Sequence, residues 1–184
     1  MPSSHSRSTL PIRSLRTHLL VAGSALVVGC ASILGAGAAA AGTSQNGYPL
    51  ITQAQTTQWA VNGVNFWTAP GKPTELLREF VTWFDANVEP ITLGNGDDWS
   101  WAEPALVPPT NTAYSNHGSG TAVDLNLEIH GGQSFSGTFT PEQTGKIRTK
   151  LASMGGQIVW GGEWSNLPDD PHFEVKWQLQ PELG

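Results

Sequence analysis

Apolar residues recur at helical spacing along "PTELLREFVTWFDANV", residues 73–88. A helix would gather them on one face, because residues three and four apart lie side by side. Pro73 suits the first turn, where its missing N–H removes no helical hydrogen bond. We therefore predict a core helix that ends near Asn87 and buries Leu76, Leu77, Phe80, Val81 and Phe84.

A second helix is predicted over residues 140–154. Thr140 is a suitable N-cap, Pro141 suits the first turn and Gln143 completes a capping box. The predicted apolar stripe and C-cap of this helix are Ile147, Leu151, Met154 and Gly155.

Alternation of apolar and polar residues predicts a strand over "TAVDLNLEI", residues 121–129. Two shorter strands are predicted at "QIVW" (157–160) and "HFEVKW" (172–177). The order helix, loop, strand, helix, strand, strand predicts an α+β domain, with a small antiparallel sheet flanked by helices. The predicted buried face of the first strand is Val123, Leu125, Leu127 and Ile129.

Two segments show no such periodicity. Residues 42–72 are rich in Thr, Gln, Asn and Gly, and we expect an extended N-terminal arm that lays its aromatic side chains onto the domain. Residues 94–114 contain Gly, Asn, Asp and three prolines, which disfavour regular structure. Two tryptophans in this second segment favour an ordered loop, and long ordered loops are commonly functional.

Residues 1–41 have the pattern of a secretory signal. Three arginines precede an uncharged apolar run from Leu19 to Leu34, and small residues follow up to Ala41. The run is too rich in Ala, Gly and Ser for a membrane anchor. We expect cleavage near Ala41 and export, which leaves the arm over 42–72 and a catalytic or binding domain over 73–184.

Cys30 offers a second route to the cell envelope, because "VVGC" resembles a bacterial lipobox. In a lipoprotein Cys30 would be lipidated and become the N-terminus. The chain stays apolar beyond Cys30, which favours cleavage near Ala41, and both routes predict a secreted or cell-envelope protein. Since Cys30 is the only cysteine, packing or a metal must stabilise the fold in place of an intramolecular disulfide.

The charge of the predicted mature chain excludes two classes of partner. It keeps six of the nine basic residues and all fifteen acidic ones, so its formal net charge is 6 − 15 = −9. Such an acidic domain has no basic surface for nucleic acid or for an anionic membrane. We expect a monomer with no integral membrane segment.

Two histidines lie near carboxylates in the sequence. His117 lies in the Gly-rich stretch "SNHGSGTAVDLN", and Asp124 follows on the polar face of the predicted strand. The small residues between them would let both side chains converge on zinc, which takes imidazole and carboxylate ligands. The competing interpretation is a plain turn whose aspartate caps a backbone amide.

A second motif, "DDPHFEV", supplies His172 and, three residues earlier, Asp169. The Asp169 carboxylate is placed to take a proton from the attacking water of a metal-assisted hydrolysis. Asp170 competes for this role, and the alternative is that both aspartates only begin the turn before Pro171. We expect His130, in "EIHGG", to be a surface turn residue.

Together the two motifs resemble the zinc D-alanyl-D-alanine carboxypeptidase family (VanY-like), which also includes phage L-alanyl-D-glutamate endolysins. The family pattern is Ser-x-His followed by x-x-Gly-x-Ala-x-Asp, then an acidic residue three positions before the histidine of His-Phe-Glu. This chain meets every fixed position, with Ser115, His117, Gly120, Ala122, Asp124, Asp169, His172, Phe173 and Glu174.

The resemblance implies that His117, Asp124 and His172 bind Zn²⁺ and that Asp169 is the general base. It also implies the fold of the Hedgehog signalling domain, and peptidoglycan stem peptides as substrates. The expected activity is that of a secreted zinc metallopeptidase that removes the terminal D-Ala. The alternatives are an L-Ala-D-Glu endopeptidase and an inactive, zinc-stabilised wall-binding domain.

The chain departs from the family in one respect. Relatives usually carry an arginine in the loop before Ser-x-His, whereas no Lys or Arg lies between Arg78 and Lys146 here. An arginine there would stabilise the oxyanion or bind the substrate carboxylate, and Arg78 is a candidate to replace it in space. Other expected contacts of the substrate or of the metal ligands are Ser115, Glu174 and Trp160.

Overall fold

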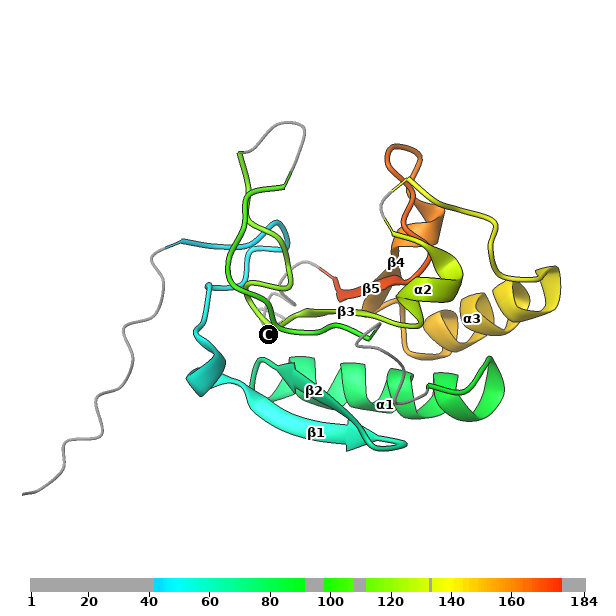
Figure 1. Ribbon diagram of the computed structural model, residues 1–184, viewed down its shortest axis with the longest axis horizontal. Coiled ribbons are helices and arrows are strands. Elements are labelled where there is room, and N and C mark those ends of the chain that lie inside the picture. Colours follow the sequence, from blue (N-terminus) through cyan, green and yellow to red (C-terminus); the bar gives the residue numbers. More distant parts are fainter. Residues whose placement is uncertain (1–41, 92–97, 108–111, 133, 177–184) are drawn as a thin grey trace, which may run out of the picture. The chain divides into compact units, whose positions relative to one another are not determined.

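A three-stranded antiparallel sheet carries the C-terminal part of the fold (Figure 1). Its strands lie in the order β3 (Ala122–Asp124), β5 (His172–Val175) and β4 (Ile158–Trp160). The computed structural model describes residues 42–91, 98–107, 112–132 and 134–176. The predicted signal segment and Cys30 lie outside these residues. The predicted α+β class, with a small antiparallel sheet and flanking helices, is confirmed.

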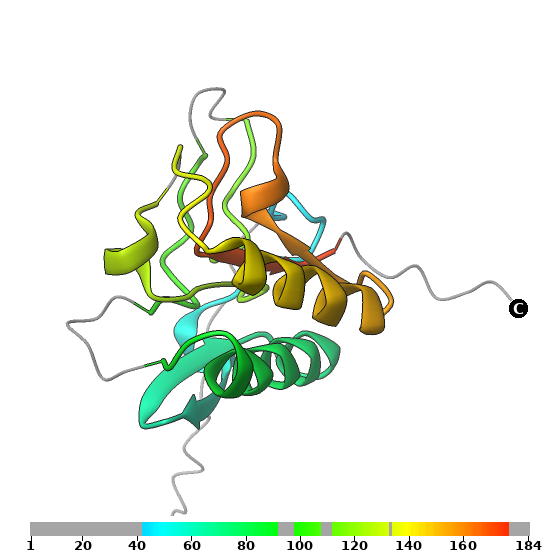
Figure 2. The ribbon, with the colours of Figure 1, turned by 90° about the vertical axis from the view of Figure 1, so that its right-hand side faces the viewer.

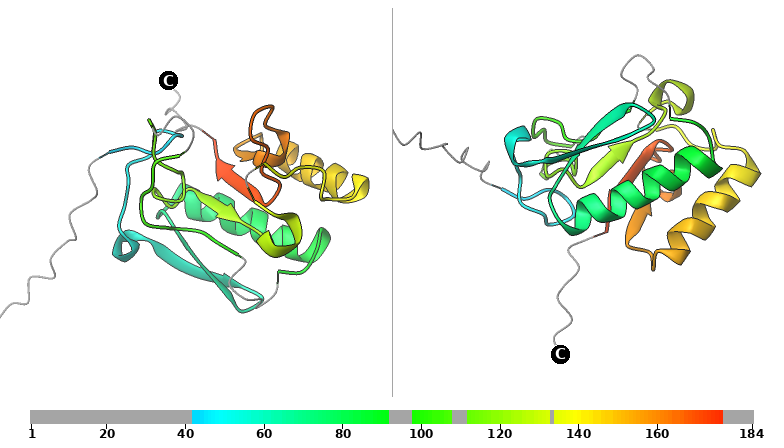
Figure 3. Two further views of the ribbon diagram at one scale, coloured as in Figure 1. Left: turned by 45° about the horizontal axis from the view of Figure 1, so that its top comes forward. Right: turned by 90° about the horizontal axis from the view of Figure 1, so that it is seen from below.

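Helix α1 (Lys72–Asn87) packs against the central strand β5. All five predicted apolar positions of this helix are buried. Phe80 and Phe84 contact Phe173 of β5, with ring centroids 4.6 and 5.8 Å apart. Seen from below in Figure 3, α1 lies across the sheet, so the opposite face is left for the loops that carry the polar motifs.

Helix α3 (Pro141–Ser153) lies beside α1 in Figure 2. Its predicted capping box is present, because Gln143 N donates to Thr140 Oγ1 and Thr140 N donates to Gln143 Oε1. Ile147 and Leu151 are buried as predicted. Helix α3 precedes β4 in the chain, and its Leu151 belongs to the same core cluster as Ile158 of β4.

The predicted strand over 121–129 is wrong in its second half. Strand β3 ends at Asp124, and Leu127–His130 form the short helix α2. Asn126 turns the chain by adopting a left-handed conformation, with φ 50° and ψ 47°. Its side chain donates to Glu89 Oε1 at 2.7 Å, a distant partner that the local alternation does not reveal. Ile129, predicted to be buried, is consequently 68% exposed.

The expected extended arm contains a β-hairpin. Strands β1 (Thr57–Val61) and β2 (Val64–Thr68) pair antiparallel after a short 3₁₀ turn, η1 (Gln53–Gln55). Asn62 and Gly63, both with positive φ, form the two-residue turn, and Asn-Gly is a strong hairpin signal. Trp59 stacks on Phe66 at 4.7 Å in the same core as α1. No helix among the described residues is long and apolar enough to cross a membrane.

Candidate metal centre

Pairing of β3 with β5 brings the two sequence motifs together. Asp124 is the direct cross-strand partner of His172, so two residues 48 positions apart meet at one end of the sheet. His117 lies in the turn before β3. Residues 99 and 124 form a further bridge, which holds the segment of Ser100 beside the same end of the sheet.

The imidazole and carboxylate groups of these residues converge. Asp124 Oδ1 lies 2.8 Å from His172 Nδ1, and Asp124 Oδ2 lies 3.3 Å from His117 Nε2. His117 Nε2 and His172 Nδ1 are 3.3 Å apart. One ligand atom from each residue lies within 4.8 Å of the others, the one such group found in the described part of the chain. Two nitrogens and one carboxylate oxygen are a donor set that suits zinc with an open position.

Outer hydrogen bonds orient both imidazole rings. His117 Nδ1 donates to the carbonyl of Ser100 at 2.6 Å, which leaves Nε2 facing the cluster. His172 Nε2 donates to Glu174 Oε2 at 3.0 Å, which leaves His172 Nδ1 facing the cluster. Asn116 Nδ2 donates to the same Glu174 oxygen at 2.6 Å. Sequence reasoning missed Ser100 and Asn116, because a backbone carbonyl and a neutral amide leave no motif.

The charges of the three residues depend strongly on one another. Burial works to raise the pKa of Asp124, but the charges and hydrogen bonds of His117 and His172 hold it well below its usual range. Burial works to lower the pKa of His172, but hydrogen bonds from its ring to Asp124 and Glu174 raise it to about 10. Since a metal binds the deprotonated imidazole nitrogen, proton and metal compete for this residue.

The two neighbouring aspartates of the second motif have different surroundings. Asp169 lines the same cavity as the cluster, and burial raises its pKa to about 6. Its Oδ1 atom is buried without a hydrogen-bond partner among the described residues. Asp170 is only 1% exposed, and its Oδ2 accepts hydrogen bonds from Thr138 N and Oγ1. Asp169 is therefore available for chemistry, whereas Asp170 is engaged in the fold.

Close packing against the 3₁₀ turn η2 (Gly161–Glu163) places Asp169. Asp169 N donates to the carbonyl of Gly161 at 3.0 Å, and His172 N donates to the Asp169 carbonyl at 3.2 Å. A Cβ atom on Gly161 would lie 2.5 Å from the Asp169 carbonyl oxygen and 3.1 Å from His172 Cβ. Only glycine therefore lets this turn approach both residues.

The cavity at the cluster has a volume of about 300 Å³. Ser115 lines it, as expected for a substrate contact, and its Oγ also accepts from His117 N at 3.2 Å. Trp164 forms part of the wall, with its ring centroid 5.2 Å from that of His172. The complete lining is Gln45, Ala105, Leu106, Val107, Ser115, His117, Asp124, Trp164, Asp169 and His172.

Trp160 does not line this cavity. It is buried between Phe139 and Phe173, and its Nε1 donates to the Asp170 carbonyl at 2.7 Å. The expectation of a substrate contact is therefore not supported by its position. Through this hydrogen bond Trp160 instead stabilises the segment that carries Asp169.

His130 is not the surface residue that we expected. It is 2% exposed and stacks on Phe139 at a centroid distance of 3.7 Å. Its Nε2 lies 2.5 Å from Glu89 Oε1, and its Nδ1 lies 2.9 Å from Thr138 Oγ1. The glycines after His130 suggested an exposed turn, but Glu89, 41 residues away, supplies the buried partner.

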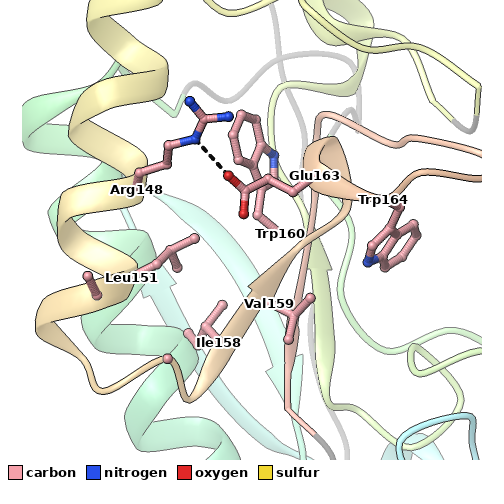
Figure 4. A pocket seen from close by; sticks show the side chains of 9 residues that line it. Arg148, Leu151, Ile158, Val159, Trp160, Glu163 and Trp164 are labelled. Atoms are coloured by element: carbon pink, nitrogen blue, oxygen red, sulfur yellow. Dashed lines mark hydrogen bonds and ion pairs between the residues drawn. The ribbon is translucent and has the colours of Figure 1, made fainter.

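No lysine or arginine side chain lines the cavity at the cluster within the described residues. Arg78 is exposed on α1, so the structure does not place it there. Arg148 pairs with Glu163 at 2.7 Å in a neighbouring cavity of about 400 Å³, which shares Trp164 with the first (Figure 4). Lysines 72, 146 and 150 also pair with glutamates, and Lys176 lies at the end of β5.

The α+β fold thus places a His-Asp-His cluster that could hold a metal ion and the Asp169 carboxylate in one cavity. Residues 109–175 match the model of the peptidase M15 family described as D-alanyl-D-alanine carboxypeptidase. This segment contains both motifs, and the match confirms the predicted resemblance to that peptidase family. No solved structure gives a significant match to the chain.

Proposed function

We propose that the protein is a zinc-dependent peptidase that acts on peptidoglycan stem peptides and removes the terminal D-Ala. The observation that carries this proposal is the convergence of His117, Asp124 and His172 with Asp169 in one cavity, inside the segment matched by the family. The predicted export supports a substrate in the cell wall. The division into signal segment, arm and domain stays a prediction.

Each residue of the site has a distinct proposed role. His117 and His172 would hold the metal through ring nitrogens that face the cluster, and the Asp124 carboxylate would complete the ligand set. When bound, zinc would supply the Lewis acidity that polarises the scissile carbonyl and activates water. Asp169, with a pKa of about 6, would accept the proton of the attacking water and pass it to the leaving amine.

Digestion of purified peptidoglycan, followed by mass spectrometry of the products, tests the proposal directly. We expect release of D-Ala in the presence of zinc, and loss of that release after the protein is treated with a chelator. Restoring zinc should restore the activity. Binding to peptidoglycan without any cleavage at any zinc concentration would contradict the proposal and favour a wall-binding domain.

A second candidate is cleavage of an internal stem-peptide bond such as L-Ala-D-Glu, because no lysine or arginine among the described residues lines the cavity. A carboxypeptidase must accommodate a free carboxylate beside the scissile bond, and here the neighbouring groups of the protein are Asp124 and Asp169. An endopeptidase does not have to bind the terminal carboxylate of the stem peptide at that position. The same mass spectra separate the two activities, because each leaves a fragment of different mass.

A further inference from the structure

The segment before the hairpin is bound tightly to the turn that carries His117. Ser44 and Asn46 are each only 4% exposed, although both are polar and lie at the beginning of the described chain. Ser44 also bridges to Tyr114, in parallel, just before the first motif. In Figure 1 this segment, drawn in cyan, lies beside the green loops that lead to β3.

A buried hydrogen-bond network makes this attachment. Asn46 N donates to Asn116 Oδ1 at 3.0 Å, and Asn46 Nδ2 donates to Thr121 Oγ1 at 2.8 Å and to the Val175 carbonyl at 2.9 Å. Ser44 Oγ lies 2.8 Å from Ser119 Oγ. Buried polar groups that are satisfied in this way hold one geometry, because each lost bond would leave an unpaired group.

Gln45 stands between these two anchors and lines the cavity of the metal cluster. Its backbone N donates to the Tyr114 carbonyl at 2.9 Å, whereas the residue itself is exposed. The backbone on both sides is therefore fixed while the side chain remains available at the site. Gln45 also lies outside residues 109–175, so the family match does not include it.

The chemistry of the cavity indicates what Gln45 would contact. Among the described residues the lining holds two aspartates and two histidines but no lysine or arginine, and it has a short apolar wall of Ala105, Leu106 and Val107. A glutamine side chain offers two N–H donors and one carbonyl acceptor. These groups match the C=O and N–H of a peptide main chain and carry no charge to attract a carboxylate.

We propose that Gln45 is a substrate-contacting residue that binds the main chain of the peptide beside the scissile bond. Through Gln45 the N-terminal segment contributes to substrate specificity, in a cavity that no described lysine or arginine lines. This inference rests on the proposed peptidase function, and it adds a residue that the two sequence motifs do not contain.

Steady-state kinetics of Gln45 variants test the inference. We expect Gln45→Ala to raise KM by about 2- to 10-fold, the range for one or two lost hydrogen bonds, with kcat and bound zinc nearly unchanged. Gln45→Lys would lower KM for a stem peptide with a free terminal carboxylate relative to its amidated form, and Gln45→Glu would do the opposite. Gln53→Ala, at an exposed glutamine in η1, is the matched control.

Two outcomes separate this inference from the proposed function. If the wild-type protein hydrolyses stem peptides and every Gln45 variant has the KM of the control, the inference is wrong and the function stands. If the wild-type protein hydrolyses nothing, binding of the uncleaved peptide is measured by NMR titration. Weaker binding by Gln45→Ala then supports the contact, and equal binding by both proteins overturns it.

Discussion

Asp169 and Asp170 show how much two adjacent carboxylates can differ. Both precede the same histidine motif, but only Asp169 lines the cavity, where burial raises its pKa to about 6. A carboxylate with such a pKa is deprotonated at neutral pH and still basic enough to take up a proton during turnover. Asp170 faces Thr138 and accepts two hydrogen bonds from it.

Matched amide substitutions of the two aspartates should therefore separate chemistry from stability. Asp169→Asn is expected to keep the fold and the zinc but to lose at least about 100-fold in kcat, since general-base catalysis contributes on this order. Asp170→Asn is expected to lower the free energy of unfolding by about 1–3 kcal/mol, because the amide disrupts a buried carboxylate–Thr138 pair. Peptide hydrolysis, zinc analysis and urea unfolding measure these effects. Normal turnover by Asp169→Asn would show that the base is assigned wrongly.

At the scale of elements, a buried hydrogen-bond network joins the segment after α1 to α2 and to the segment that precedes β5. Thr138 Oγ1 donates to Asp170, so it must accept a hydrogen bond from His130 Nδ1. The other ring nitrogen of His130 faces the Glu89 carboxylate. Burial works to raise the pKa of Glu89, but the hydrogen bonds from His130, Asn126 and Gln143 hold it below its ordinary value.

This network predicts a pH-dependent loss of stability in Glu89→Gln. Because the folded-state pKa of Glu89 is depressed, its ionised form stabilises the fold above the ordinary glutamate pKa of about 4.3. That contribution is lost as the pH falls through the folded-state pKa. We expect Glu89→Gln to be less stable than wild type by about 1–3 kcal/mol at pH 7, with a smaller difference at about pH 3.

Urea unfolding at the two pH values measures the difference. Glu128→Gln, at an exposed position on α2, is the control for removing an acidic residue from the same region. A difference between Glu89→Gln and wild type that stays constant with pH would contradict the role of the ionised carboxylate.

At the scale of the whole molecule, the candidate ligands come from three places in the fold. The His117 turn, β3 and β5 each supply one side chain, and α1 packs beneath β5 through Phe173. A metal held by all three residues would join these parts of the domain. The domain has no cysteine for a disulfide, because the only cysteine of the chain, Cys30, lies in the predicted signal segment. Ligands that bind only the folded state raise its stability by mass action.

We therefore expect zinc to raise the Tm of the protein and a chelator to reverse the gain. Glu174→Gln should need about 10–100-fold more zinc for the same rise, because Glu174 orients the His172 ring. Glu142→Gln, at an exposed position on α3, should behave like wild type. Thermal melts over a zinc titration measure the shift, and a Tm independent of zinc in all three proteins would argue against the metal site.

The local pattern of the sequence was enough to predict several elements. The spacing of Leu76 to Phe84 predicted α1, and Thr140 with Gln143 predicted the start of α3, because these signals involve residues within one or two turns of each other. The two motifs likewise named the cluster of His117, Asp124 and His172, through their resemblance to a metallopeptidase family. Asn62–Gly63 is also a local hairpin signal, and it lies in the polar segment that we expected to form an extended arm.

Tertiary structure decided whatever depends on partners far away in the chain. Glu89 holds Asn126 and buries His130, which ends β3 early and overturns the prediction of a surface histidine. Thr138 engages Asp170, and the network around Asn46 brings Gln45 to the cavity. Periodicity reports which face of an element is apolar, and a motif reports which groups could do chemistry. Only the folded chain determines which polar groups are satisfied by each other and which remain free to act.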